Sequence, residues 1–294
     1  MASTTYQRFN TRAGRAFDVV NVVVLVVVGL VALLPFLYVL AGSFATEYEI
    51  TTRPFFLWPH EFTSASYESI LSSEIFVRAF VTTVVVTLVG TLIQLGLTAL
   101  MAYPLSKIDL PGRRTFLSLI VFAMVFSAGM IPTFLVVKDL GLLDSYWALF
   151  LPMAINPFSL IIIKNFFQQL PQELEEAAKI DGANELKVLW HVVLPLSKPV
   201  LATFALFYAV GIWNDYMSPL LYLSDTSKWT LQMILRQVTA SASLSAEDLN
   251  TEVPPPAQGI KFAVVIIATI PVLLAYPFLQ KHFAKGMLIG SVKG

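Results

Sequence analysis

Six long apolar runs, separated by polar loops, dominate the sequence. A transmembrane helix needs about 20 mostly apolar residues, and most of the runs reach that length. Because proline frees backbone carbonyls that neighbouring helices must satisfy, the fourth run, with Pro152 and Pro157, is expected to pack inside a helix bundle. The pattern predicts an all-α integral membrane protein with six transmembrane helices, in one domain covering residues 1–294. The runs lie near Asp18–Ser43, Phe76–Tyr103, Phe116–Val137, Tyr146–Ile163, Pro199–Leu223 and Phe262–Leu279.

The composition agrees with a protein that resides in a bilayer. The chain is 56% hydrophobic and 13% charged, whereas a soluble domain carries about 25% charged residues. Its formal net charge is zero, which argues against a nucleic-acid partner. It contains no cysteine, so disulfides, thiolate metal sites and cysteine nucleophiles are excluded.

The distribution of basic residues predicts the orientation in the membrane. The first apolar run follows Arg8, Arg12 and Arg15, and it is too long for the apolar core of a signal peptide, so we interpret it as a retained first span. With a cytoplasmic N-terminus, the inside segments hold 13 of the 19 Lys and Arg residues and the outside segments hold six. By the positive-inside rule both termini are then cytoplasmic, as is the loop of residues 164–198.

This cytoplasmic loop carries a spaced motif. Glu176-Ala177-Ala178 is followed after three residues by Gly182, and after nine more by Val192-Val193-Leu194-Pro195. The spacing resembles the EAA signature, Glu-Ala-Ala-x3-Gly-x9-Ile-x-Leu-Pro, of the membrane subunits of ATP-binding-cassette (ABC) importers. The signature's Ile is replaced conservatively by Val192.

The same loop has signals for two short helices. Pro171 is suited to the start of a helix, and Gly182 is expected to end or bend it. Leu174, Ala177, Ala178 and Asp181 are spaced to share one face with small residues. Residues 185–191 predict a second helix that ends before Pro195. Such a loop could seat in a groove of an ATPase, or it could simply lie on the membrane surface.

The resemblance extends over most of the chain after the first span. It is to the carbohydrate branch of importer permeases, and to the smaller, maltose-permease-like subunit within it. The subgroup most similar handles polysaccharide-derived oligosaccharides, including alginate and pectin fragments. The resembling stretches are Gly129–Pro132, Leu140–Ala148, Lys164–Phe167, Leu194–Pro199, Trp213–Tyr216, Tyr276–Lys281, Lys285-Gly286 and Gly290–Gly294.

The resemblance implies a type I importer fold in the bacterial inner membrane and a defined set of partners. These are a second homologous permease subunit that completes a heterodimer, two cytoplasmic ATPase subunits that hold ATP and Mg²⁺, and an extracytoplasmic solute-binding protein. The chain itself would bind membrane lipid and an oligosaccharide but no cofactor. The residues expected to couple to the ATPase are Glu176, Ala177, Ala178, Asp181, Gly182, Leu194 and Pro195.

Two interpretations are open for each of three further segments. The tail Lys285–Gly294 could reach the ATPase interface or be a frayed terminus. The outside loops Phe44–Ile75 and Ser224–Gly259 could dock the binding protein or merely cap the bundle.

Polar residues within the spans are candidates for the substrate pathway, because such residues usually face a bundle interior or a cavity. An aromatic face beside amide and carboxylate groups suits a sugar, and Tyr208 lies seven residues before Asp215 on one helical face. Alternatively, Asn214 bridges helices, Asp215 lies near the outer interface, and the partner permease makes most sugar contacts. The candidates are Gln94, Asn156, Trp213, Asn214 and Asp215.

Enzymatic chemistry is not indicated. No G-x4-G-K-[ST] phosphate loop is present, so ATP hydrolysis is expected on a separate ATPase. His60, His191 and His282 are scattered in different loops and have no metal-ligand spacing. We therefore expect the membrane-spanning permease subunit of an ATP-driven oligosaccharide importer that works by alternating access. The alternatives are an ABC permease for a non-sugar solute, an ion-driven secondary transporter and a membrane-embedded enzyme.

Overall fold

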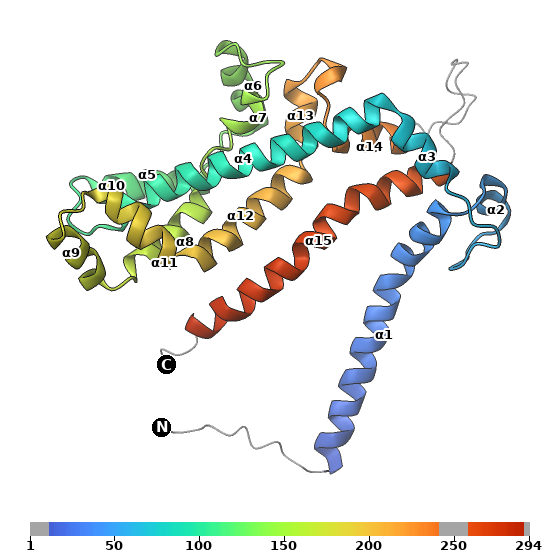
Figure 1. The fold of residues 1–294 in the computed structure, drawn as a ribbon, viewed down its shortest axis with the longest axis horizontal. Coiled ribbons are helices and arrows are strands. Elements are labelled where there is room, and N and C mark those ends of the chain that lie inside the picture. Colours follow the sequence, from blue (N-terminus) through green and yellow to red (C-terminus); the bar gives the residue numbers. More distant parts are fainter. Residues whose placement is uncertain (1–11, 241–257, 291–294) are drawn as a thin grey trace. The chain divides into compact units, whose positions relative to one another are not determined.

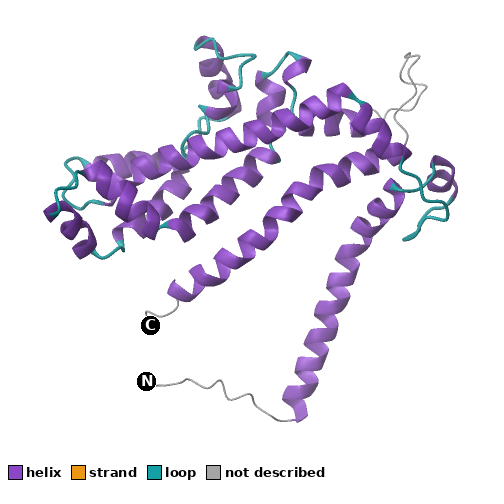
Figure 2. Cartoon of the chain, viewed as in Figure 1, coloured by secondary structure: helices purple, strands orange, loops and turns teal. Residues whose placement is uncertain are grey.

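The computed structural model describes residues 12–240 and 258–290, and all regular elements within these ranges are helical (Figure 2). The elements are α1 (Arg12–Ser43), α2 (Glu47–Thr52), α3 (Ala65–Ser72), α4 (Glu74–Ser106), α5 (Arg113–Val125), α6 (Met130–Asp139), α7 (Trp147–Phe150), α8 (Pro157–Gln168), α9 (Gln172–Ile180), α10 (Glu185–Val188), the π-helix η1 (Leu189–Val193), α11 (Leu194–Leu196), α12 (Lys198–Trp213), α13 (Met217–Tyr222), the 3₁₀ helix η2 (Thr226–Lys228), α14 (Leu231–Ala240) and α15 (Gln258–Gly290).

The chain divides into two compact units. One contains the described parts of residues 1–70 and 250–266, and the other contains those of residues 71–249 and 267–294. Whether the protein behaves as one domain, as the sequence predicts, stays a prediction.

The first unit is built around α1. Every residue of α1 from Ala16 to Leu37 is exposed, which suits contact with lipid tails because these are as apolar as the side chains themselves. The end of α1 is instead packed, and Tyr38 stacks on Phe55 with ring centroids 5.4 Å apart and meets Phe262 edge-on at 5.5 Å. A Cβ at Gly42 would lie 2.4 Å from the Phe262 ring, so only glycine permits this close approach.

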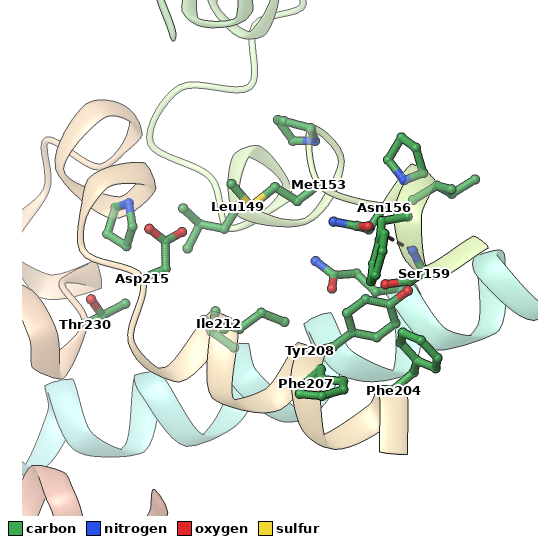
Figure 3. A pocket seen from close by; sticks show the side chains of 18 of the residues that line it. Leu149, Met153, Asn156, Ser159, Phe204, Phe207, Tyr208, Ile212, Asp215 and Thr230 are labelled. Atoms are coloured by element: carbon green, nitrogen blue, oxygen red, sulfur yellow. Dashed lines mark hydrogen bonds between the residues drawn. The ribbon is translucent and has the colours of Figure 1, made fainter. Parts of the chain in front are cut away.

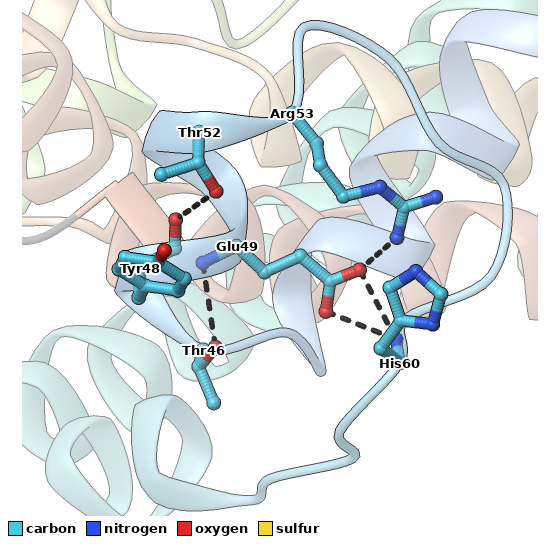
Figure 4. A network of polar contacts seen from close by, with 6 residues as sticks. All are labelled: Thr46, Tyr48, Glu49, Thr52, Arg53 and His60. Atoms are coloured by element: carbon cyan, nitrogen blue, oxygen red, sulfur yellow. Dashed lines mark hydrogen bonds and ion pairs between the residues drawn. The ribbon is translucent and has the colours of Figure 1, made fainter.

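A buried carboxylate organises the segment after α1 (Figure 4). Glu49 is only 5% exposed, and its two carboxylate oxygens accept the His60 backbone N–H at 3.1 and 3.0 Å. Arg53, four residues further on, forms an ion pair with the same carboxylate. Burial alone would raise the pKa of Glu49, but the His60 N–H and the Arg53 guanidinium together hold it below its ordinary value.

The second unit is centred on α4, which packs against α12 and α8 (Figure 1). Ser73 caps α4 by accepting the Phe76 N–H at 3.4 Å. The core on the C-terminal half of α4 joins this helix to α8 and to the loop before α12. Its most deeply buried side chains are Ala102, Leu160, Ile163, Val188, Leu189 and Val193.

The helices that could span a membrane match the predicted runs in part. Three are long and apolar enough by themselves, namely Ala16–Ser43, Glu74–Ser106 and Gln258–Ala275. Two further candidates are bent pairs: α5 with α6, at 116°, and Glu185–Leu196 with α12, at 83°. Within the described residues these make at most five candidates, so the count of six stays a prediction.

The fourth predicted run is broken in its middle. It consists of α7 and α8 with no regular helix over residues 151–156. Pro157 begins α8, where its missing N–H costs nothing, and Asn156 caps the same helix by accepting the Ser159 N–H at 3.1 Å. Leu149 and Leu160 on its flanks are buried, whereas Leu151, Pro152 and Met153 in the break are exposed. The expected packing inside a bundle therefore holds for the flanks and not for the break itself.

Asp144 ties the loop between α6 and α7 to the loop after α13. Its carboxylate oxygen Oδ1 accepts the Ser224 N–H at 2.7 Å and the Asp225 N–H at 2.8 Å. Its own N–H donates to the Tyr222 carbonyl at 2.8 Å, and the Lys228 ammonium donates to its carbonyl at 2.6 Å. Its φ of 57° lies in the left-handed region, which Asp and Asn tolerate better than most residues.

Asp144→Ala is therefore expected to lower the free energy of unfolding by about 1–3 kcal/mol, because two backbone donors lose a charged acceptor and the left-handed backbone becomes less favourable. Asp144→Asn keeps an acceptor oxygen and tolerates the same φ, so its effect is expected to be smaller. Thermal unfolding of the purified protein in detergent measures both. Equal destabilisation by the two variants would contradict this account.

Candidate functional site

The first part of the cytoplasmic loop folds as the sequence predicts. Helix α9 begins directly after Pro171 and ends at Ile180. Gly182 has a φ of +83°, and its N–H donates to the Lys179 carbonyl at 3.0 Å while the Ala183 N–H donates to the Ala178 carbonyl at 2.9 Å. This pair of bonds is a Schellman motif, which needs a left-handed residue and so favours glycine. The prediction that Gly182 ends the helix is confirmed.

The prediction that Pro195 ends the second helix is wrong. Asn184 caps α10 by accepting the Lys187 N–H at 2.9 Å, and the helical run then continues through η1 into α11, which contains Pro195. In η1 the Leu194 N–H donates to the Leu189 carbonyl, five residues back. Because Pro195 stands in the first turn of the new α11, no α-helical donor is lost. The run ends at Ser197.

A polar network ties this loop to the C-terminal end of α4. The Tyr103 hydroxyl donates to the Glu185 carboxylate at 2.6 Å, and the same carboxylate pairs with Lys179 at 2.6 Å. Lys107 forms an ion pair with Glu175, and its ammonium lies 4.5 Å from the centre of the Tyr103 ring. Residues of α4, α9 and α10 are therefore held together outside the apolar core. This network was not predicted from the sequence, although Tyr103 and Lys107 are one helical turn apart.

The outer face of the loop is apolar in places. Ile180 is 86% exposed, Leu186 and Trp190 are each 61% exposed, and Leu174 is 44% exposed. The expected face of small residues is divided. Ala178 packs against the core cluster of the second unit, while the other predicted coupling residues mostly face outward. Glu176, Ala177, Asp181, Gly182 and Pro195 are exposed, and Leu194 is half-buried.

A cavity of about 730 Å³ lies beside the middle of α4 (Figure 3), within the range of about 300–1,000 Å³ typical of ligand sites. Gln94, Asn156 and Asp215, three of the five predicted pathway residues, line it. So does Tyr208, whose hydroxyl lies 3.1 Å from that of Thr98. Asp215 and Thr230 lie toward one end, and Asn156, Ser159 and Tyr208 lie toward the other.

Two of these side chains also accept backbone N–H groups at the start of a helix. Asn156 caps α8, and the Asp215 carboxylate accepts the Ser218 N–H at 3.1 Å at the start of α13. Gln94 is different: it is only 6% exposed and has no hydrogen-bond partner within the described residues. Phe204, Phe207 and Thr230 also line the cavity and were not predicted, although Phe204 and Tyr208 are four residues apart on α12.

The other two predicted pathway residues lie elsewhere. Trp213 is buried, its indole N–H donates to the Ala268 carbonyl at 3.0 Å, and its ring meets Phe80 edge-on at 6.0 Å. The Asn214 amide donates to the Val210 carbonyl of its own helix at 2.9 Å. Neither lines the cavity, and contact of any of the five with substrate stays a prediction.

Removing the Glu185 carboxylate tests the network. Glu185→Ala is expected to lower the free energy of unfolding by about 1 kcal/mol, because the Tyr103 hydroxyl and Lys179 both lose their acceptor. Glu185→Gln keeps an acceptor for Tyr103 and is expected to cost less. Thermal unfolding in detergent compares the two, with Glu173→Ala on exposed α9 as the control. An unchanged midpoint for Glu185→Ala would contradict a bracing role.

The pairing also predicts a pH effect. The hydrogen bond to Glu185 raises the pKa of Lys179 above its ordinary 10.5. A raised pKa in the folded state gives a stabilisation that is complete below the ordinary value and is lost as the pH rises through the raised one. In alkaline unfolding scans, the stability difference between wild type and Glu185→Gln should shrink above pH 10.5. A difference that stays constant would argue against the ion pair.

Comparison with known proteins agrees with this architecture. Protein LplC of Bacillus subtilis (strain 168) is 61% identical over 97% of this chain and 97% of its own length. The polygalacturonan/rhamnogalacturonan transport system permease protein YtcP of the same organism is 53% identical over 95% of this chain and 99% of its own length.

Among solved structures, a chain of a bacterial ABC transporter involved in the import of the acidic polysaccharide alginate is 35% identical, with a TM-score of 0.86 over 94% of this chain and 99% of that one. A chain of the bacterial alginate ABC transporter in complex with alginate pentasaccharide-bound periplasmic protein shares the fold at 13% identity, with a TM-score of 0.56 over 90% and 93% of the two chains. The resemblance to importer permeases is confirmed. Because the family described as "Binding-protein-dependent transport system inner membrane component" matches residues 1–289, the chain belongs to that family.

Proposed function

We propose that this chain is the membrane-spanning permease subunit of an ATP-driven importer for oligosaccharides, including those derived from acidic polysaccharides. The observation that carries the proposal is the cytoplasmic loop. It has the spacing of the EAA signature, an exposed and partly apolar outer face, and an inner face fixed to α4. A part of the protein that transmits force needs both a contact surface and a rigid connection to the pathway.

The outer face is suited to a protein partner. Exposed Ile180, Leu186 and Trp190 lie within 11 residues of one another in a loop between apolar segments, and exposed apolar side chains that gather in this way usually mark interaction sites. Small residues beside them, Ala177 and Gly182, leave room for the backbone of an ATPase to approach. The ion pairs at the base of α9 would then carry its movement to α4.

The assembly we propose has three kinds of protein partner around this chain. A second homologous permease completes a heterodimer, two ATPases bind the loop side, and a solute-binding protein delivers substrate from outside. Both termini are cytoplasmic. ATP and Mg²⁺ belong to the ATPases, and this chain binds lipid and substrate but no cofactor. The similarity to chains of the alginate transporter, one of them solved with a periplasmic protein, supports this arrangement.

An oligosaccharide is the favoured substrate. A relative 53% identical over nearly its whole length carries polygalacturonan/rhamnogalacturonan transport in its name, and the cavity offers aromatic faces beside amides. These features speak against the alternatives of a non-sugar solute and of ion-driven transport. In alternating access, ATP binding opens the cavity outward to receive sugar, and hydrolysis returns it to face inward.

The assembly can be tested by affinity purification from native membranes in mild detergent, followed by reconstitution into proteoliposomes. Recovery of a second permease and an ATPase, with ATP-dependent uptake of oligogalacturonides, is the expected result. Recovery of this chain alone across several detergents, with a folded control, would weigh against the importer. Uptake driven by an ion gradient without ATP would favour a secondary transporter.

Gly182 tests the coupling role separately. A Cβ at this position meets nothing within 4 Å, so a substitution acts through the backbone and through contact with the partner. Gly182→Val is expected to strain the left-handed conformation by about 1–2 kcal/mol and to reduce uptake and sugar-stimulated ATPase activity by about tenfold or more, with normal insertion into the membrane.

Gly182→Asn is the matched variant, because asparagine tolerates a positive φ. It separates backbone strain from bulk: uptake near the wild-type level would assign the defect of the valine variant to strain. Wild-type uptake and ATPase coupling in both variants would contradict a coupling role for this turn.

A further inference from the structure

The wall of the cavity holds polar groups that the protein itself does not satisfy. Gln94 is 6% exposed and Thr230 is 4% exposed. The buried Thr230 hydroxyl oxygen has no hydrogen-bond partner within the described residues, and no hydrogen bond joins the Gln94 amide to another described residue. A buried polar group without a partner destabilises the fold. These two line an open cavity, where a ligand with hydroxyl groups or water can supply the missing bonds.

Aromatic side chains lie on the same wall. Phe204, Phe207 and Tyr208 follow one another along α12 and all line the cavity. The Phe204 ring centroid is 5.9 Å from that of Phe207 and 6.4 Å from that of Tyr208. The axial C–H groups of a pyranose ring pack well on such rings, while the hydroxyl groups at its edge need amide or hydroxyl partners. Asn156 offers its amide nitrogen at this end of the cavity, since its oxygen caps α8.

The charge of the wall is negative. Asp215 contributes a carboxylate, and the other residues that line the cavity include no Lys, Arg or His. A carboxylate close to Asp215 would be repelled, and this repulsion is stronger beside a protein of low dielectric constant than in water. A uronate is an acidic sugar, so its carboxylate cannot be neutralised by this wall. Proteins similar to this chain nevertheless include one named for polygalacturonan and one for alginate.

We infer that the cavity is a sugar subsite that recognises ring faces and hydroxyl groups and repels carboxylates, so that the carboxylates of an acidic oligosaccharide point away from this chain. The inference rests on the proposed function and extends it. It assigns Gln94, Asn156 and the α12 aromatics to sugar contact and Asp215 to charge discrimination. The positive charge that a polyuronate needs then lies on another surface of the pathway.

Trigalacturonate and its methyl ester are the probes, because they share a ring skeleton and differ in charge. Uptake of each is measured with the whole assembly, purified with its ATPase and binding protein and placed in proteoliposomes. Asp215→Asn removes the charge, and its amide oxygen still accepts the Ser218 N–H. It is expected to raise uptake of the free acid relative to the ester severalfold. Since the binding protein is the same in both preparations, a changed ratio arises from this chain.

Gln94→Leu tests the hydroxyl contact. It is expected to lower uptake of both probes by about fivefold to tenfold, the equivalent of one hydrogen bond. Its thermal midpoint should stay unchanged or rise, since no internal hydrogen bond is lost. Gln232→Leu, which removes an amide from an α14 residue that does not line the cavity, is the control and is expected to behave as wild type.

The outcomes separate the two proposals. Wild-type uptake of both probes by Gln94→Leu would overturn the sugar contact. An unchanged acid-to-ester ratio in Asp215→Asn would overturn the charge discrimination. Neither result would contradict the importer function. Failure of the wild-type assembly to take up either probe would contradict the oligosaccharide function. It would also contradict the sugar subsite, which depends on that function.

Discussion

In the hydrocarbon of a membrane no water is available to satisfy the backbone, so every interruption of a helix must be completed by the protein. Two such interruptions in the second unit lie beside the cavity, one before α8 and one after α12. In each case a side chain accepts a backbone N–H at the start of the next helix: Asn156 does so at α8 and Asp215 at α13. The same two side chains line the cavity. The cavity therefore lies where the helices are broken, and the residues that make the breaks tolerable are also polar groups of its wall.

Helix α4 connects this cavity with the cytoplasmic loop. Gln94 lies on the cavity, and Tyr103 and Lys107 lie at or just beyond the helix end that holds α9 and α10. Nine residues separate Gln94 from Tyr103, which corresponds to about 13 Å along a helix. Because an unbroken helix resists bending, a displacement of the loop reaches the cavity along a short, stiff path. In the proposed importer, the network at the end of α4 would be the mechanical joint between the two surfaces.

The sequence alone predicted the features that depend on local chemistry. The first two spans and α9, with its glycine terminus, follow from apolar length and from the requirement for a left-handed residue at Gly182. The sequence could not predict features that depend on contacts between residues far apart in the chain. The π-turn before Pro195 depends on how Leu189 and Val193 are buried together, and the position of Trp213 depends on the Ala268 carbonyl, 55 residues away. The signature spacing identified the loop without revealing which of its residues face inward.

The hydrogen bonds around Asp144 restrict how the segments that it joins can move relative to one another. Asp144 joins the α6–α7 loop to the segment after α13 through both carboxylate and backbone groups. These two segments must then travel as one body. Irregular residues lie on either side of the joined segments. They are residues 126–129, where α5 meets α6 at 116° and Gly129 has a φ of +85°, and residues 214–216 between α12 and α13. Asp215 lies in the second of these stretches, so a movement of the joined segments would also reposition the cavity's carboxylate.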